Sequence, residues 1–188
     1  MESEHRNGYS NPHWKAAGFS SYEKDVDGPG SFRLPARALN IIWGNDPRFW
    51  QWTKLTDEDK RFVRFEEGAL LLQVNWIEVT GKLELPSLKL GSTGKYKIYY
   101  MVKFRADAFG WHSVPVKFKV RHNREETQNR LLLESYREKH DVWHEIPGGE
   151  FSVAGNNGGT VEFGMYEVES DWWKGSMVLG GIKVLPAN

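Results

Sequence analysis

Apolar and polar positions alternate with a period of two along most of the chain after residue 35. The pattern is clearest in YKIYYMVKF (96–104) and VPVKFKV (114–120), which are rich in β-branched and aromatic residues. Such segments favour strands, and the glycine, proline and asparagine clusters between them favour turns. Further segments of this type lie at residues 38–43, 69–85, 129–135, 142–146, 160–169 and 177–185. The pattern predicts an all-β chain of eight or nine strands, typical of an antiparallel β-sandwich or barrel.

At most one short helix is expected within this pattern, in LTDEDKRFVRF (55–65). Thr56 is a suitable N-cap, Asp59 follows three residues later, and acidic residues fill the first turn. These features are typical of a helix N-terminus, because side-chain oxygens accept hydrogen bonds from its free N–H groups.

Residues 1–34 differ from the rest because they are polar and show no apolar period. We therefore predict a flexible N-terminal arm over residues 1–34 and a single domain over residues 35–188. Trp14 and Phe19 are the arm residues that could dock on the domain, although nothing in the sequence requires it.

The composition excludes several classes of protein. Lysine plus arginine and aspartate plus glutamate are equal at 25 each, which argues against binding driven by phosphate neutralisation. The chain contains no cysteine, so disulfides and thiolate metal sites are excluded. No apolar signal region or membrane-spanning run is present in the sequence. These features favour a cytoplasmic, nuclear or sap-borne protein that is not secreted by a signal peptide.

The histidines do not have the spacing of a metal site. His140 and His144 are four residues apart in a predicted strand, where that spacing corresponds to about 13 Å. No phosphate-binding or dinucleotide-binding glycine motif occurs either. We therefore expect no metal and no cofactor.

Carboxylate pairs for glycoside hydrolysis need a separation of about 5–10 Å. Glu162 and Glu167 differ by five positions, so an unbroken strand places them on opposite faces unless Gly164 forms a bulge. Glu145 and Glu150 are a second pair, across a Pro-Gly-Gly segment. Acidic residues that alternate with apolar ones usually form the solvent face of a strand, and we expect no enzyme.

One strand carries a basic face. Lys117, Lys119 and Arg121 share one side of the predicted strand, opposite apolar residues. Such a face is usually solvated, but it is also the best electrostatic site in the chain for an acidic partner.

The segment IIWGNDPRFWQW (41–52) is unusual because it contains three tryptophans around a turn-forming GNDP. Trp43 ends one strand, whereas Trp50 and Trp52 share a side of the next. From their spacing alone, these tryptophans could equally well lie in the core or form an exposed platform for a ligand. An exposed platform would suit sugars, because stacking one ring on an apolar sugar face is worth about 1–1.5 kcal/mol. Trp76, at the centre of an apolar segment, is predicted to lie in the core.

Four blocks of the chain resemble the phloem protein 2 family of plant lectins. They are ARALNIIWGNDPRFWQW (36–52), LLQVNWIEVTGKLEL (71–85), VWHEIPGGEF (142–151) and TVEFGMYEVESDWWKGSMVLGGIKV (160–184). The resemblance covers about residues 36–186. It implies a jelly-roll-like β-sandwich, commonly a homodimer, in the nucleocytoplasm or phloem sap.

The resemblance also implies a ligand and a site. Family members bind N-acetylglucosamine oligomers, and some bind N-glycan cores. Their site tryptophans match Trp43 and Trp50, and a site glutamate matches Glu167. A second family glutamate falls on Thr160, for which neighbouring Glu162 could substitute. Trp52 would extend the platform or pack beneath it.

We therefore predict a non-catalytic lectin of plant stress or phloem defence that binds chito-oligosaccharides or glycoproteins containing N-acetylglucosamine. The alternative is an RNA- or protein-binding phloem component that uses the aromatic platform and the basic strand face. Zero net charge makes nucleic acid the less favoured partner, and no membrane insertion is expected.

Overall fold

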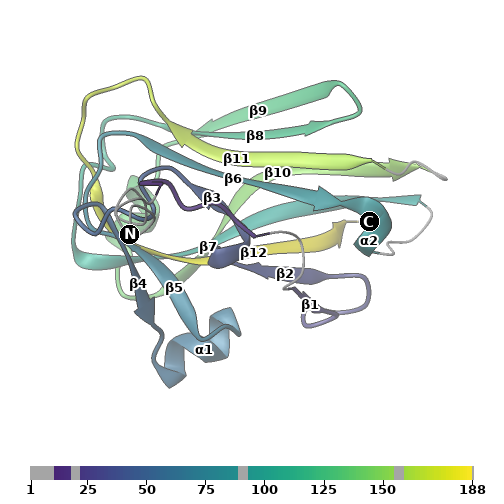
Figure 1. The fold of residues 1–188 in the computed structure, drawn as a ribbon, viewed down its shortest axis with the longest axis horizontal. Coiled ribbons are helices and arrows are strands. Elements are labelled where there is room, and N and C mark those ends of the chain that lie inside the picture. Colours follow the sequence, from purple (N-terminus) through teal and green to yellow (C-terminus); the bar gives the residue numbers. More distant parts are fainter. Residues whose placement is uncertain (1–10, 18–21, 89–92, 155–158, 188) are drawn as a thin grey trace, which may run out of the picture.

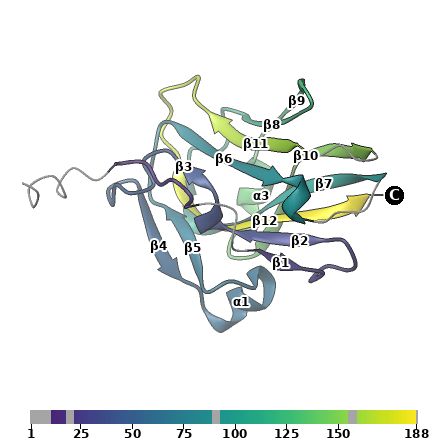
Figure 2. The ribbon, with the colours of Figure 1, turned by 45° about the vertical axis from the view of Figure 1, so that its right-hand side comes forward.

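Two antiparallel β-sheets make up most of the chain in the computed structural model, which describes residues 11–17, 22–88, 93–154 and 159–187. The sheets pack face to face (Figures 1 and 2). The predicted fold class, an all-β antiparallel sandwich, is confirmed. No helix in the described ranges is long and apolar enough to cross a membrane.

The larger sheet has seven strands. They are β1 (Glu23–Lys24), β2 (Phe32–Pro35), β4 (Trp50–Lys54), β5 (Glu67–Leu71), β7 (Thr93–Phe109), β10 (Trp143–Ala154) and β12 (Gly175–Ala187). β12 pairs with β7 along one side, while its other side pairs first with β5 and then with β2. β10 pairs with β7 and forms one edge.

Gly181 allows β12 to change partner between β5 and β2. Its φ is +128°, and a Cβ at this position would lie 2.1 Å from the carbonyl oxygen of Leu34. Only glycine adopts that conformation without strain and lets the β2 backbone approach so closely. The register between β12 and β7 shifts at the same point, between Leu179 and Gly181.

The smaller sheet has five strands in the order β3-β6-β11-β8-β9. They are β3 (Asn40–Ile41), β6 (Ile77–Glu84), β11 (Thr160–Glu167), β8 (Val116–His122) and β9 (Glu125–Leu131). Three short helices lie in connections between the two sheets: the 3₁₀-helix η2 (Ala36–Ala38), α2 (Leu85–Leu88) and α3 (Glu134–Glu138). A fourth, α1 (Asp57–Val63), joins β4 to β5 within the larger sheet.

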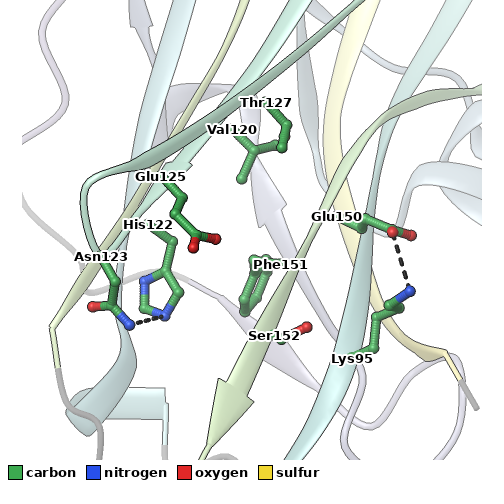
Figure 3. A pocket seen from close by; sticks show the side chains of 9 residues that line it. All are labelled: Lys95, Val120, His122, Asn123, Glu125, Thr127, Glu150, Phe151 and Ser152. Carbon is green, nitrogen blue, oxygen red and sulfur yellow. Dashed lines mark hydrogen bonds and ion pairs between the residues drawn. The ribbon is translucent and has the colours of Figure 1, made fainter.

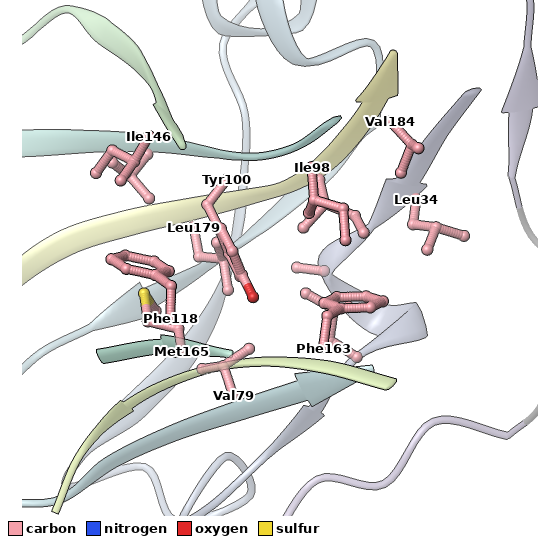
Figure 4. Packing of buried hydrophobic residues seen from close by; sticks show 14 of the residues in the cluster. Leu34, Val79, Ile98, Tyr100, Phe118, Ile146, Phe163, Met165, Leu179 and Val184 are labelled. Atoms are coloured by element: carbon pink, nitrogen blue, oxygen red, sulfur yellow. The ribbon is translucent and has the colours of Figure 1, made fainter. Parts of the chain in front are cut away.

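The core fills the space between the sheets (Figure 4). Alternate residues of β6 and β8 point inward, as the period-two pattern predicts. From the opposite sheet, Tyr100 packs its ring on Phe118 at 5.2 Å and on Phe163 at 6.4 Å between ring centroids. Interdigitated aromatic side chains of this kind contribute large apolar areas to the core.

The predicted helix is confirmed as α1. The Thr56 hydroxyl accepts a hydrogen bond from the Asp59 N–H at 3.1 Å, and the Asp59 carboxylate accepts one from the Thr56 N–H, which makes a capping box. Asp59 also accepts hydrogen bonds from Lys103 and the Trp143 indole, both at 2.9 Å. The N-terminus of α1 is thereby attached to the outer face of the larger sheet.

The number and limits of the strands differ from the prediction. The described part of the chain has twelve strands, because two-residue pairings and split segments carry no periodic signal. The predicted strand at 69–85 is two strands, β5 and β6, which belong to different sheets. The segment 38–43 is mostly turn after β3, and residues 129–135 end β9 and begin α3.

The prediction of a flexible arm over residues 1–34 is wrong for its second half. Phe32 and Leu34 lie in β2 and are fully buried in the core. Within the first half, Trp14 exchanges two backbone hydrogen bonds with Ile41, at 2.9 and 2.8 Å, so residues 11–17 lie beside β3. The suggested docking of Trp14 is thus confirmed, whereas Phe19 lies outside the described residues.

Candidate functional site

The loop after β3 holds Trp43 in an uncommon backbone conformation. Its φ is +65°, a value that bulky side chains rarely adopt. The Trp43 N–H donates to His13 Nδ1 at 2.9 Å, and the Trp43 carbonyl accepts from the Asp46 N–H at 3.0 Å. Asp46 in turn accepts three hydrogen bonds from Arg48, which lower the pKa of its carboxyl group. Strain of this kind is often found at binding sites.

Trp43 lines a hollow of about 370 Å³ at this end of the sandwich. We call it the tryptophan hollow; its lining residues are His13, Ile42, Trp43, Asn75, Trp76 and Glu78. Trp43 is half-buried, and the His13 ring contacts it edge-on at 5.0 Å. Two indoles with a carboxylate, an amide and an imidazole around them combine an apolar surface with polar groups that can orient a ligand.

Trp76 was predicted to be a core residue, and that prediction is wrong. Its side chain is 45% exposed. The inward positions of β6 are Ile77, Val79 and Leu83, so Trp76 has the opposite parity and points outward. Counting parity back from the apolar positions of the strand could have revealed this.

The family resemblance implied that Trp50 is a site residue exposed to a ligand, and the structure contradicts that exposure. Its ring is 2% exposed and belongs to the main core cluster. β4 pairs with β5 so that Trp50 lies opposite Leu71, and both side chains are directed into the core. The indole N–H is buried with no hydrogen-bond partner among the described residues. Trp50 therefore does not line the hollow with Trp43.

Trp52 packs beside the hollow rather than extending it. The Arg37 guanidinium lies 4.0 Å from the centre of its ring, and the Trp14 ring contacts it edge-on at 5.2 Å. The Trp14 indole N–H donates to the Arg37 carbonyl oxygen at 3.1 Å. This stack fixes residues 11–17 and, through them, the position of His13 in the hollow.

Glu167 is not exposed to a ligand in this structure. It forms an ion pair with Lys174 at 2.7 Å, and both side chains are 1% exposed. Glu167 also accepts a hydrogen bond from the Ser170 hydroxyl at 3.0 Å. Lys174 Nζ donates to the backbone carbonyl oxygen of Trp172 at 2.8 Å and lies 3.5 Å from that of Asn75. The pair positions the loops around the hollow instead of lining it.

Glu162 and Thr160 lie far from Glu167. The β11 register has no bulge at Gly164, so Glu162 and Glu167 are on opposite faces of the strand, as an unbroken strand predicts. Glu162 is exposed, 3.9 Å from Lys82. The Thr160 hydroxyl donates to Glu84 at the other end of β11. The structure does not bring these residues together as a carboxylate site.

A second hollow of about 370 Å³ lies between the β10 edge and the β8–β9 hairpin (Figure 3). Phe151 lies in its wall, with Glu125 and His122 on the hairpin side and the Glu150–Lys95 ion pair, 3.2 Å, on the other. It contains no tryptophan, and sequence reasoning did not indicate it. His122 pairs with Val161 near the start of β11, whereas the tryptophan hollow adjoins the end of β11 about 20 Å away.

The basic face of β8 is present as predicted, but acidic and aromatic groups cover it. Lys117 forms an ion pair with Glu169 at 3.2 Å, and Lys119 lies 5.1 Å from the centre of the Tyr166 ring. Hydrogen bonds from Arg130 and Lys117 lower the pKa of Glu169. The described residues contain no cluster of three or more groups that could hold a metal ion.

The sequence profile of the phloem protein 2 family matches residues 30–186, which include the five-stranded sheet, the larger sheet except β1, and the lining of the tryptophan hollow except His13. The chain belongs to the phloem protein 2 family. The match begins before β2, in agreement with the buried position of that strand.

Similar proteins include two from Arabidopsis thaliana. Putative F-box protein PP2-B12 is 34% identical over 164 residues, which cover 85% of this chain and 62% of that protein. PHLOEM PROTEIN 2-LIKE A1 is 29% identical over 168 residues, which cover 88% of this chain and 65% of that protein. The chain thus spans somewhat less than two thirds of these relatives.

Solved structures resemble the chain only distantly. A TmCBM61 structure in complex with β-1,4-galactotriose has a TM-score of 0.43 at 11% identity, covering 79% of this chain and 87% of that one. The insecticidal crystal protein Cry2Aa has a TM-score of 0.47 at 12% identity, and the likeness covers 83% of this chain and 21% of that one. Neither likeness says what this chain binds.

Proposed function

We propose that the chain is a non-catalytic lectin that binds N-acetylglucosamine oligomers in the tryptophan hollow. One observation carries the proposal: Trp43 and the 45%-exposed Trp76 line the same hollow, together with Glu78 and Asn75. Family membership supports it. The dimeric state and the nucleocytoplasmic or phloem-sap location that the resemblance implied remain part of this proposal.

The chemistry of the hollow suits a sugar ring. An indole covers the apolar C–H face of the ring, while a carboxylate accepts hydrogen bonds from hydroxyl groups and an amide both donates and accepts. Burial of roughly 50 Å² of apolar surface per stacked ring is worth about 1–1.5 kcal/mol. In this proposal Glu78 accepts these hydrogen bonds, in place of Glu167, the site glutamate that the family resemblance implied. The alternative, an RNA- or protein-binding role for the basic face, is less well supported because Lys117 and Lys119 already have partners.

The test is calorimetric titration of chitotriose into the wild-type chain and the Trp76→Ala variant. We expect binding to the wild type and about a tenfold loss of affinity in the variant, since a stacked ring is worth about 1.4 kcal/mol. Leu132→Ala is the matched control: it is 46% exposed and follows β9, the strand at the other edge of the five-stranded sheet. Equal affinity of all three proteins would remove Trp76 from the site, and no binding by the wild type would overturn the proposal.

A further inference from the structure

Exposed tryptophans continue beyond the hollow along the same end of the sandwich. Trp172 is 47% exposed and Trp173 is 45% exposed; we call these two residues the aromatic ledge. Val74 and Lys174 exchange two backbone hydrogen bonds of 2.9 Å, which form an antiparallel bridge. The segment that carries Trp76 therefore lies beside the segment that carries the ledge.

One buried cation holds both segments in place. Lys174 Nζ donates to the carbonyl oxygen of Trp172 and lies within hydrogen-bonding distance of that of Asn75, the neighbour of Trp76. Glu167 neutralises this cation and accepts from the Ser170 hydroxyl, which in turn accepts from the Trp172 N–H at 3.3 Å. The aromatic rings are thus presented by a preorganised backbone, so little conformational entropy is lost when a ligand binds.

Aromatic contacts connect the hollow to the ledge. Phe49 lies between them, with its ring centroid 5.7 Å from that of Trp43 and 6.4 Å from that of Trp173. The Trp172 ring contacts His112 edge-on at 5.6 Å. The exposed and half-buried rings therefore form one connected set that is longer than the hollow alone.

Acidic groups border this surface. Asp171 is exposed immediately before the ledge, and Glu78 lines the adjoining hollow. The nearby cations Lys174 and Arg48 are paired with Glu167 and Asp46. A phosphate-rich chain would be repelled here, whereas a neutral chain of rings would not.

We propose that the aromatic ledge binds further rings of a linear, neutral sugar chain whose first rings occupy the tryptophan hollow. The inference rests on the proposed function and names its ligand more narrowly: an oligosaccharide long enough to reach from Trp43 and Trp76 to Trp172. The ledge then distinguishes long chains from short ones, because only long chains cover it. The exposure of two large neighbouring aromatic rings is explained in this way.

The test measures how affinity depends on chain length. N-acetylglucosamine oligomers of two, four and six rings are titrated into the wild type, Trp172→Ala, Trp172→Phe and the control Val142→Ala, whose side chain is exposed in the loop before β10. We expect Trp172→Ala to bind the two-ring oligomer as the wild type does and to bind the six-ring oligomer about tenfold more weakly. Trp172→Phe should restore most of the loss, and Val142→Ala should behave as the wild type.

The outcomes separate the two proposals. If the wild type binds no oligomer, the proposed function is overturned and the ledge proposal with it. If the wild type binds but Trp172→Ala keeps the same preference for longer chains, only the ledge proposal is overturned. Light scattering on the same samples tests whether a second copy of the chain covers the ledge instead. If Trp172→Ala forms a smaller assembly than the wild type and its affinity still rises with oligomer length as in the wild type, the ledge is an interface between copies of the chain. Denaturant melts confirm that each variant is folded.

Discussion

Two tryptophan-containing segments of this protein place their side chains in opposite ways. In residues 49–52 the aromatic Trp50 is buried and the polar Gln51 is exposed. In residues 172–174 the tryptophans are exposed and the charged Lys174 is buried. The second arrangement is unfavourable unless the cation is paired, and Glu167 provides that partner.

The difference shows what each segment contributes. Trp50 belongs to a strand that is paired along five residues with β5, so strand parity determines which side chains are buried. The segment around Lys174 is attached by a single bridge and a buried ion pair, so its aromatic rings are left outside. The first segment contributes mainly to stability and the second to the surface offered to a ligand. Four variants, in three predictions, can break or sharpen this comparison.

The largest effect is expected for Trp50→Ala. Removal of a fully buried indole leaves a cavity, and the free energy of unfolding should fall by about 3–5 kcal/mol. Trp50→Phe is the control: it keeps a buried aromatic ring, and the only polar group it removes is an N–H that has no partner among the described residues, so its cost should be clearly smaller. Urea denaturation measures both. A Trp50→Ala variant as stable as the wild type would place this ring outside the core.

A slightly smaller loss is expected for Glu167→Ala. This change leaves Lys174 buried without its counter-ion, which should lower the free energy of unfolding by about 3 kcal/mol. Glu162→Ala is the matched control on the same strand, because Glu162 is exposed and its ion pair is long, so its effect should stay within about 0.5 kcal/mol. Urea melts at neutral pH compare the two variants. Equal stability would mean that the Glu167–Lys174 pair is not what secures the loop.

The smallest effect on stability is expected for Trp76→Ala and Trp172→Ala. Exposed side chains lose few contacts on truncation, so each variant should unfold within about 0.5 kcal/mol of the wild type. Thermal and urea melts provide the measurement, and Trp50→Ala is the positive control for a destabilising loss of indole. A loss of 2 kcal/mol or more in either variant would show that these rings pack against the domain.

The periodic pattern of the sequence was sufficient for the fold class, the α1 helix and the alternation along β8. These features depend on local properties: strand parity, capping side chains and the clustering of turn residues act within a few positions. The family was also identifiable from the sequence, because its four blocks retain their order. The period-two signal failed where a strand pairs over two residues, as in β1 and β3, since no alternation can be seen at that length.

Strand parity could have placed Trp76 on the outer side, but only the tertiary structure decided how far each tryptophan is exposed. Trp50 and Trp76 have the same chemistry and lie in equally apolar surroundings in the sequence, yet one is buried and the other is 45% exposed. Their environments depend on which sheet covers which strand face and on the bridge between Val74 and Lys174, which joins residues a hundred positions apart. The burial of Glu167 could not be predicted from the sequence either. A carboxylate is buried only when a cation neutralises it, and the cation here, Lys174, comes from another segment of the chain. Periodicity reports which side of a strand a residue occupies, whereas exposure depends on what is packed against that side.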